Sequence, residues 1–189
     1  MNNEKIGRFI SYLLRHKPES LKLKMDKNGY VEVKELIEKV NMTEKYKNTL
    51  SIEKLEEIVA TDSKKRYSYD KTKTKIRAVQ GHSFSVDVAK KSIPPVVLYH
   101  GTSKEAYNII RKKGIQKMNR DWVHLSKDIE TAKNVGLRHC KNKKDLVILK
   151  IDTKRMLADS FSFFVAENGV WLSDYIPTKY IEKIENPLD

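Results

Sequence analysis

Three arginines lie at positions where a guanidinium group can bind phosphate. Arg15 is followed by His16 near the end of a predicted helix, and Arg138 ends a later one before a lysine-rich loop. Arg77 lies in a predicted strand. Guanidinium donors match a phosphate bidentately, and a neighbouring histidine adds a donor or a proton. Cations at helix ends are equally explained by the helix dipole. We predict that Arg15, Arg77 and Arg138 converge on one phosphate.

The run Ile76–Ser83, IRAVQGHS, places arginine, glutamine, histidine and serine around a glycine at the exit of that strand. The glycine permits close approach of the backbone to a ligand, and the side chains form a dense set of donors. The alternative is the exposed tip of a hairpin with incidental polar residues. The run alone leaves both interpretations open.

Two later strands end in a histidine followed closely by a small hydroxyl residue. His100 precedes Gly101 and Thr102 where we expect a strand to pass into a helix, and His124 precedes Ser126 in the same setting. Backbone donors at a helix N-terminus, a hydroxyl and a glycine suit a ribose or a carboxamide. Each hydroxyl is also explained as a simple N-cap. The repetition favours a binding site.

The first half of the chain predicts three helices and a hairpin that position Arg15 and Arg77. Apolar residues recur from Ile6 at helical spacing, and Pro18 ends that helix. The other expected elements are a turn at 26–29, helices carrying 36–40 and 52–59 with a cap at Thr49 or Ser51, and extended runs at 66–69 and 75–79. Three helices followed by a hairpin is the layout of a winged helix, a common nucleic-acid-binding architecture.

Pro94-Pro95 marks the expected boundary between two lobes, because a proline pair interrupts both a helix and a central strand. Beyond it we expect strands at 96–99, 123–125, 147–151, 161–165, 170–172 and 181–184, and helices over 106–110 and 129–135, the second capped by Ser126. Asn168-Gly169 is typical of a tight hairpin turn. This half predicts an α+β fold with a mainly antiparallel sheet.

Composition limits the classes of function. The 189 residues include 38 Lys and Arg against 25 Asp and Glu, a formal charge of +13 that favours a polyanionic partner, although a lysine-rich proteome gives the same excess. One cysteine excludes an intrachain disulfide, and no glycine fingerprint, Walker loop or metal-ligand cluster is present. Without a membrane-length apolar run or a signal peptide, we expect a cytoplasmic protein that does not bind membranes.

Together these segments resemble the RNA 2′-phosphotransferase family, the tRNA 2′-phosphotransferases. The matching stretches, in family order, are SYLLRH (11–16), DKNGYVEV (26–33), KKRYS (64–68), IRAVQGHS (76–83), LYHGTS (98–103), R-x-x-VHLS (120–126), VGLRH (135–139) and NGVWL (168–172). Each stretch alone is weak evidence. IRAVQGHS and LYHGTS in this order are highly specific, and the matches span nearly the whole chain.

The resemblance implies a winged-helix RNA-binding lobe over 1–93 and an ADP-ribosyltransferase-like lobe over 96–189 that binds NAD⁺ as co-substrate. It implies that the internal 2′-phosphate of a spliced RNA such as tRNA attacks C1″ of the nicotinamide ribose, which expels nicotinamide and forms RNA-2′-phospho-ADP-ribose. The 2″-hydroxyl then attacks phosphorus and releases the RNA with ADP-ribose 1″,2″-cyclic phosphate. We expect a monomer with RNA and NAD⁺ as its partners.

The resemblance also assigns residues. Arg15, Arg77 and Arg138 match the family's catalytic arginines, and His16 matches its catalytic histidine. We assign His16 as a donor to the phosphate in the second step and as an acid for the leaving 2′-oxygen. The NAD-binding positions are matched by His100, Gly101, Thr102, His124, Ser126 and Val170. No metal ion is expected, because the arginines supply the positive charge.

The chain departs from the family at a few positions. Cys140 stands where glycine is usual, Ser173 where threonine is usual, and 164–167 differs from a tyrosine-containing run. Val170 stands where many ADP-ribosyltransferases carry glutamate, which argues against protein ADP-ribosylation. Two other functions stay open: ADP-ribosyl transfer to a terminal phosphate of RNA or DNA, and a winged-helix regulator that senses NAD⁺.

Overall fold

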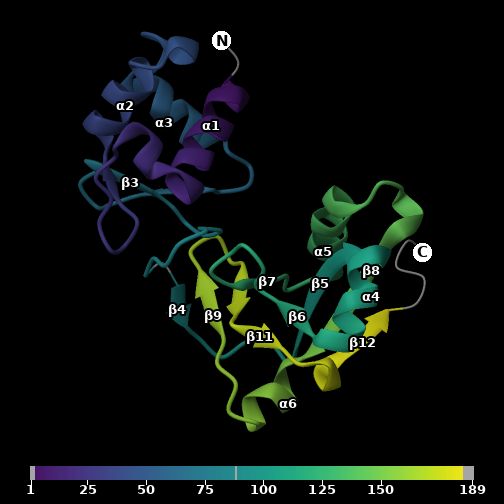
Figure 1. Ribbon diagram of the computed structural model, residues 1–189. Coiled ribbons are helices and arrows are strands. Elements are labelled where there is room, and N and C mark those ends of the chain that lie inside the picture. Colours follow the sequence, from purple (N-terminus) through teal and green to yellow (C-terminus); the bar gives the residue numbers. More distant parts are fainter. Residues whose placement is uncertain (1–2, 88, 185–189) are drawn as a thin grey trace. The chain divides into compact units, whose positions relative to one another are not determined.

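The computed structural model describes residues 3–87 and 89–184, which form two compact units, 1–88 and 89–189 (Figure 1). The expected boundary at Pro94-Pro95 lies beyond the strand Ala89–Lys91, which pairs with a strand of the second unit. No helix in the described part of the chain is both long and apolar enough to cross a membrane.

The first unit combines three helices with a small antiparallel sheet. Its elements are α1 (Asn3–His16), η1 (Pro18–Leu21), β1 (Val31–Glu32), α2 (Val33–Asn41), η2 (Glu44–Tyr46), α3 (Ile52–Thr61), β2 (Tyr67–Tyr69) and β3 (Lys75–Ala78). The strand order is β1-β3-β2. The predicted helices and hairpin are confirmed, and the Ser51 hydroxyl caps α3 by accepting from the Lys54 amide at 3.2 Å. Assignment to the winged-helix fold stays a prediction.

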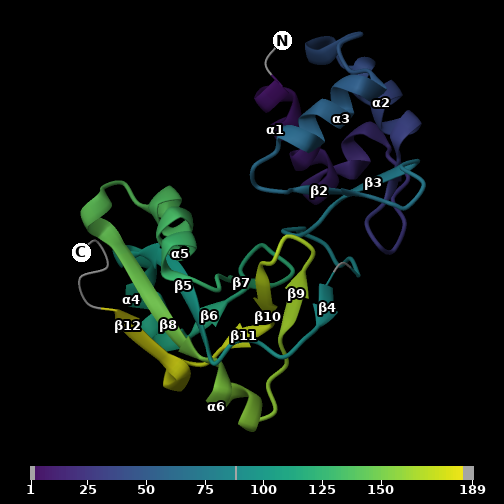
Figure 2. The ribbon, with the colours of Figure 1, turned by 180° about the vertical axis from the view of Figure 1, so that it is seen from behind.

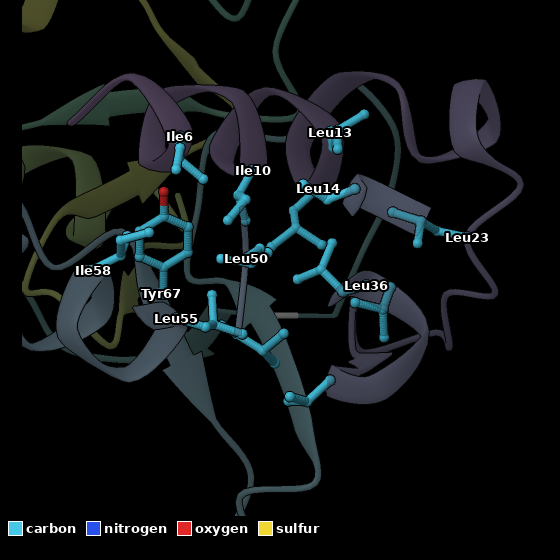
Figure 3. Packing of buried hydrophobic residues seen from close by; sticks show 14 of the residues in the cluster. Ile6, Ile10, Leu13, Leu14, Leu23, Leu36, Leu50, Leu55, Ile58 and Tyr67 are labelled. Atoms are coloured by element: carbon cyan, nitrogen blue, oxygen red, sulfur yellow. The ribbon is translucent and has the colours of Figure 1, made fainter. Parts of the chain in front are cut away.

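The apolar stripe of α1 forms the core of this unit, as its spacing predicts. Ile10 and Leu14 are fully buried and point toward α3, where Leu55 is also fully buried (Figure 3). The buried Tyr67 hydroxyl donates to the carbonyl oxygen of Gly7. This packing fixes the last turn of α1, where Arg15 and His16 lie, against the sheet that carries Arg77.

The second unit contains three small sheets in which each pair of described strands is antiparallel, which confirms the predicted pattern. The strand orders are β4-β9-β10-β7, β11-β6 and β12-β8-β5. Its strands are β4 (Ala89–Lys91), β5 (Val97–Ser103), β6 (Ile115–Gln116), β7 (Val123–Leu125), β8 (Leu146–Asp152), β9 (Phe164–Ala166), β10 (Trp171–Ser173), β11 (Tyr175–Ile176) and β12 (Ile181–Ile184). The central place of β8 follows from its run of buried apolar residues (Figure 2).

The helices of this unit are α4 (Lys104–Lys113), α5 (Ile129–Gly136), η3 (Leu137–His139), η4 (Lys143–Asp145), α6 (Thr153–Ala158) and η5 (Thr178–Tyr180). The predicted cap of α5 is wrong: Asp128, not Ser126, accepts from the Thr131 amide, at 2.7 Å. The backbone of Ser126 instead pairs with Tyr99 through two hydrogen bonds of 2.8 Å, which link β5 to β7. Assignment to the ADP-ribosyltransferase fold stays a prediction.

Candidate functional site

The segment 81–83 is held against the end of α1, where Arg15 lies. The Ser83 amide donates to the Arg15 carbonyl oxygen at 3.0 Å. Gly81 has φ +85°, and a β-carbon there would lie 3.8 Å from the guanidinium carbon of Arg15. The backbone of the IRAVQGHS turn therefore packs along the Arg15 side chain. Glycine is needed because other residues rarely adopt this left-handed conformation.

Arg77 is fixed by two contacts with the turn at 26–29 and the residue after it. Its Nη1 donates to the Asn28 carbonyl oxygen at 3.1 Å, and its guanidinium carbon lies 4.6 Å from the centre of the Tyr30 ring. Its strand neighbours Ile76 and Ala78 are fully buried in the core, so Arg77 lies on the opposite face of β3. A planar guanidinium that is held by stacking and a hydrogen bond is preorganised for bidentate contact with a phosphate.

His82 is a buried residue of this unit that the sequence marked only as one donor of the IRAVQGHS run. Its side chain is 1% exposed. Burial, and after it the charges of Arg15, His16 and Arg77, lower the pKa of His82 to about 4. The structure therefore brings these three predicted site residues together around a neutral imidazole. Within the described residues, Nε2 of His82 has no hydrogen-bond partner.

In the second unit, His100 and His124 lie on the linked strands β5 and β7. Nδ1 of His100 lies 3.0 Å from the His124 carbonyl oxygen. A carbonyl accepts, so Nδ1 carries the hydrogen and Nε2 is the acceptor nitrogen of the neutral ring. Burial lowers the pKa of His100, as does the nearby charge of His139, while the hydrogen bond to His124 opposes them.

Arg120 joins His124 to the predicted site residue Arg138. Nη1 of Arg120 lies 2.5 Å from Nδ1 of His124. Because a guanidinium only donates, Nδ1 accepts, and Nε2 of neutral His124 carries the hydrogen. Desolvation lowers the pKa of Arg120, and the charge of Arg138 lowers it further. Arg120 begins the R-x-x-VHLS stretch, but its proximity to Arg138 depends on tertiary structure, so the sequence predicted no role for it.

An aromatic pair lies beside these histidines. The ring centres of Trp122 and Phe164 are 4.8 Å apart. Nε1 of Trp122 is buried, and no acceptor for it lies within residues 3–87 and 89–184. Val170 accepts from the Ala166 amide at 3.0 Å in the hairpin between β9 and β10. A buried indole donor beside an aromatic ring is suited to a planar, polar ligand.

The predicted passage from strand to helix after His100 is confirmed, because α4 follows β5 directly. The placing of Gly101 and Thr102 at the helix N-terminus is wrong. Strand β5 continues through both, with Gly101 opposite Ile148 and Thr102 opposite Val147, and Ser103 caps α4. A β-carbon on Gly101 would lie 1.8 Å from the Ala132 carbonyl oxygen of α5. Glycine is therefore required here for the packing of a helix on a strand.

The predicted site residues thus form one group in each unit. The first unit gathers Arg15, His16 and Arg77, and the second gathers His100, His124, Ser126 and Arg138. Convergence of all three arginines on one phosphate stays a prediction.

Comparison with known proteins gives a consistent result. Residues 1–175 match the family described as RNA 2′-phosphotransferase, Tpt1/KptA family. The chain is 52% identical over 182 residues to a probable RNA 2′-phosphotransferase of Fusobacterium nucleatum, covering 96% of this chain and 98% of the relative. Identity to a protein of the same description in Flavobacterium johnsoniae is 46% over 178 residues, 94% of each chain. For Burkholderia pseudomallei it is 42% over 177 residues, 93% of this chain and 92% of the relative.

Proposed function

This chain belongs to the RNA 2′-phosphotransferase family, Tpt1/KptA, and from that premise we propose that it removes an internal 2′-phosphate from RNA in a reaction that consumes NAD⁺. Membership of this family supports the removal of a 2′-phosphate from RNA. The proposal adds that transfer proceeds through RNA-2′-phospho-ADP-ribose and yields nicotinamide and ADP-ribose 1″,2″-cyclic phosphate.

The observation that carries the proposal is the cationic group around His82. The side-chain charges that act on His82 come from Arg15, His16 and Arg77, and all three favour its neutral form. Cations gathered around a neutral ring have the charge that a phosphate dianion needs. A dianion is already a nucleophile, so the first step requires positioning more than activation.

The same residues suit the second step. Charge then develops on phosphorus and on the departing 2′-oxygen, and fixed guanidinium groups stabilise it. His16, at the end of α1, is assigned as a donor to the phosphate and as the acid that protonates the 2′-oxygen. Arg138 of η3 is assigned as the third arginine on the phosphate.

The second unit has donors and acceptors that fit NAD⁺. Neutral His100 has an acceptor at Nε2, and neutral His124 has a donor at the same atom. The buried Nε1 of Trp122 adds a donor next to an aromatic ring. The ribose hydroxyls and the carboxamide of NAD⁺ each both donate and accept hydrogen bonds, so they require donors and acceptors in the same site. Bound NAD⁺ would supply an electrophilic ribose carbon with nicotinamide as its leaving group, and the protein would hold the ribose and exclude water.

The decisive experiment is product analysis. Purified protein is incubated with NAD⁺ and a short RNA that bears one internal 2′-phosphate, and the products are resolved by mass spectrometry. We expect dephosphorylated RNA, nicotinamide and ADP-ribose 1″,2″-cyclic phosphate. Arg15→Ala should abolish them, whereas Arg8→Ala, which removes an exposed arginine of the same helix, should not.

Two results would contradict the proposal. A stable ADP-ribosylated nucleic acid as the end product would indicate transfer to a terminal phosphate. Release of free inorganic phosphate without consumption of NAD⁺ would indicate simple hydrolysis.

A further inference from the structure

A groove of about 560 Å³ lies in the first unit next to the phosphate-binding residues. One wall runs from His16 to Lys27 and the other from Ser83 to Val86. Backbone hydrogen bonds tie the two walls together at both ends, from Ser83 to Arg15 and from Asp87 to Lys27, each 3.0 Å long. These hydrogen bonds hold the two walls in place, so the groove is part of the fold of this unit.

The charged groups of the groove are balanced and largely engaged. Glu19 pairs with Lys17 at 3.5 Å, and Oδ1 of Asp26 accepts from the amides of Asn28 and Tyr30 at 2.9 and 3.0 Å. Glu19 is thus offset by Lys17, and Asp26 offsets the charge of Lys27, which also lines the groove. Such a surface does not favour a phosphate group, whereas an uncharged polar ligand suits it.

The rest of the lining is apolar and includes Pro18, Met25, Phe84 and Val86. Phe84 is half-buried and lies outside the hydrophobic core cluster of this unit. The Phe84 and His82 rings form a T-shaped pair, with centres 5.5 Å apart and planes at 65°. One ring of such a pair presents its edge to the other, so His82 covers at most one face of the Phe84 ring and leaves the other for stacking.

His16 belongs to both the groove and the cationic group around His82. A ribose whose 2′-phosphate is bound by Arg15, His16 and Arg77 therefore has this groove beside it. We propose that the groove binds a nucleoside of the RNA adjoining the 2′-phosphate, with its base stacked on Phe84. This inference rests on the proposed function, because it takes the phosphorylated RNA as the ligand.

The chemistry of the groove also predicts its selectivity. Every base has a π-face, so stacking on one phenyl ring tolerates any base. Two serines lie on either side of Phe84. The Ser83 hydroxyl donates to the Arg15 carbonyl oxygen at 3.4 Å and can accept from a ribose hydroxyl, and Ser85 adds a second hydroxyl. The groove should therefore require a base and discriminate little among the four bases.

The test compares two ligands by calorimetry without NAD⁺: an RNA dinucleotide with a 2′-phosphate, and ribose 2-phosphate, which has no base. Phe84→Ala should weaken binding of the dinucleotide roughly 5- to 100-fold and leave ribose 2-phosphate unchanged, since base stacking on an aromatic ring contributes this much. Phe84→Trp should restore dinucleotide binding. Met42→Ala, which removes a 68% exposed apolar side chain of the same unit, is the matched control.

Equal loss for both ligands would overturn the proposal, because it would indicate a structural role for Phe84. Unchanged dinucleotide binding would overturn it too. Both Phe84 variants are checked for native thermal unfolding, and Phe84→Trp covers the case in which the alanine variant does not fold. If the dinucleotide-specific loss appears while the wild-type protein forms no ADP-ribose 1″,2″-cyclic phosphate, the groove assignment stands and the proposed function fails.

Discussion

Gly101 and Gly136 are in direct backbone contact: a β-carbon on Gly136 would lie 3.0 Å from Cα of Gly101 and 2.6 Å from Cδ1 of Leu146. Strand β5, helix α5 and the turn that carries Arg138 meet at this point. Gly101→Ala would drive a methyl group into the Ala132 carbonyl oxygen. We expect a loss of roughly 3 kcal/mol or more in the free energy of unfolding, measured by urea denaturation, because backbone cannot yield as a flexible side chain does.

The control for this prediction is Gly169→Asn. Gly169 has φ +80°, and a β-carbon there would meet nothing within 4 Å, so its requirement is conformational alone. Asparagine tolerates this left-handed region, and we expect a change of about 1 kcal/mol or less. Equal losses for the two variants would contradict the packing argument.

His82 predicts a pH dependence of stability. Its folded-state pKa of about 4 lies below the ordinary value of 6.5, so the unfolded chain binds more protons between these limits. The contribution of His82 to the free energy of unfolding is fully present above pH 6.5. As the pH falls from 6.5 to 4 the free energy of unfolding decreases by about 3 kcal/mol. Urea denaturation at several pH values should show a shallower acid slope for His82→Gln than for the wild-type protein.

The exposed His139 gives a control in the other unit, since His139→Gln removes a histidine and leaves the groups around His82 unchanged. That variant should change the slope between pH 6.5 and 4 far less than His82→Gln does. Identical slopes for His82→Gln and the wild-type protein would show that His82 is not held neutral by its surroundings.

Features set by local sequence were predictable. The stripe beginning at Ile6, the Ser51 cap and the turn at Asn168-Gly169 each depend on a few neighbouring residues, and each element appears as expected. The hairpin signal at Asn168-Gly169 also agreed with the antiparallel pairing predicted for the second half.

Features set by long-range contacts were not predictable in this way. Ser126 has the chemistry of a cap, but its backbone pairs with Tyr99, which leaves Asp128 to begin α5. The role of Gly101 depends on its packing against Ala132 of α5. The buried His82 lies in a segment that a hydrogen bond from the Ser83 amide holds against the end of α1. The two-residue strand β1 has too little periodicity to be found from its sequence.

The single cysteine should be slow to react. Burial raises the pKa of Cys140, as does the nearby charge of Asp145, and its Sγ donates to the Gly136 carbonyl oxygen at 3.3 Å. A smaller thiolate fraction lowers the rate of alkylation. We expect iodoacetamide at pH 7.5 to modify the folded protein several-fold more slowly than glutathione or the urea-unfolded chain. Equal rates of alkylation for the folded and unfolded protein would contradict a raised pKa of Cys140.

His100 should affect the NAD⁺ requirement before it affects RNA binding. His100→Ala removes the ring held by the His124 carbonyl oxygen and with it the acceptor at Nε2. Steady-state kinetics should show a raised KM for NAD⁺, about tenfold or more for a lost hydrogen bond in a buried site, with RNA affinity unchanged. An unaltered KM for NAD⁺ would remove His100 from the cofactor site.

Arg77 should matter far more for turnover than for RNA affinity. Its guanidinium is fixed by the Asn28 carbonyl oxygen and the Tyr30 ring, so both Arg77→Ala and Arg77→Lys lose the preorganised planar geometry. We expect turnover to fall about a hundredfold or more in both variants, as for loss of one charge-stabilising donor. RNA affinity should fall only a few-fold, because the other cations still bind phosphates.

RNA affinity should also decline steeply with salt. In Arg77→Ala the slope of log affinity against log salt concentration should be smaller in magnitude by about 0.7, because one phosphate is no longer neutralised. Arg8→Ala is the control, and wild-type turnover in Arg77→Ala would exclude Arg77 from the reaction.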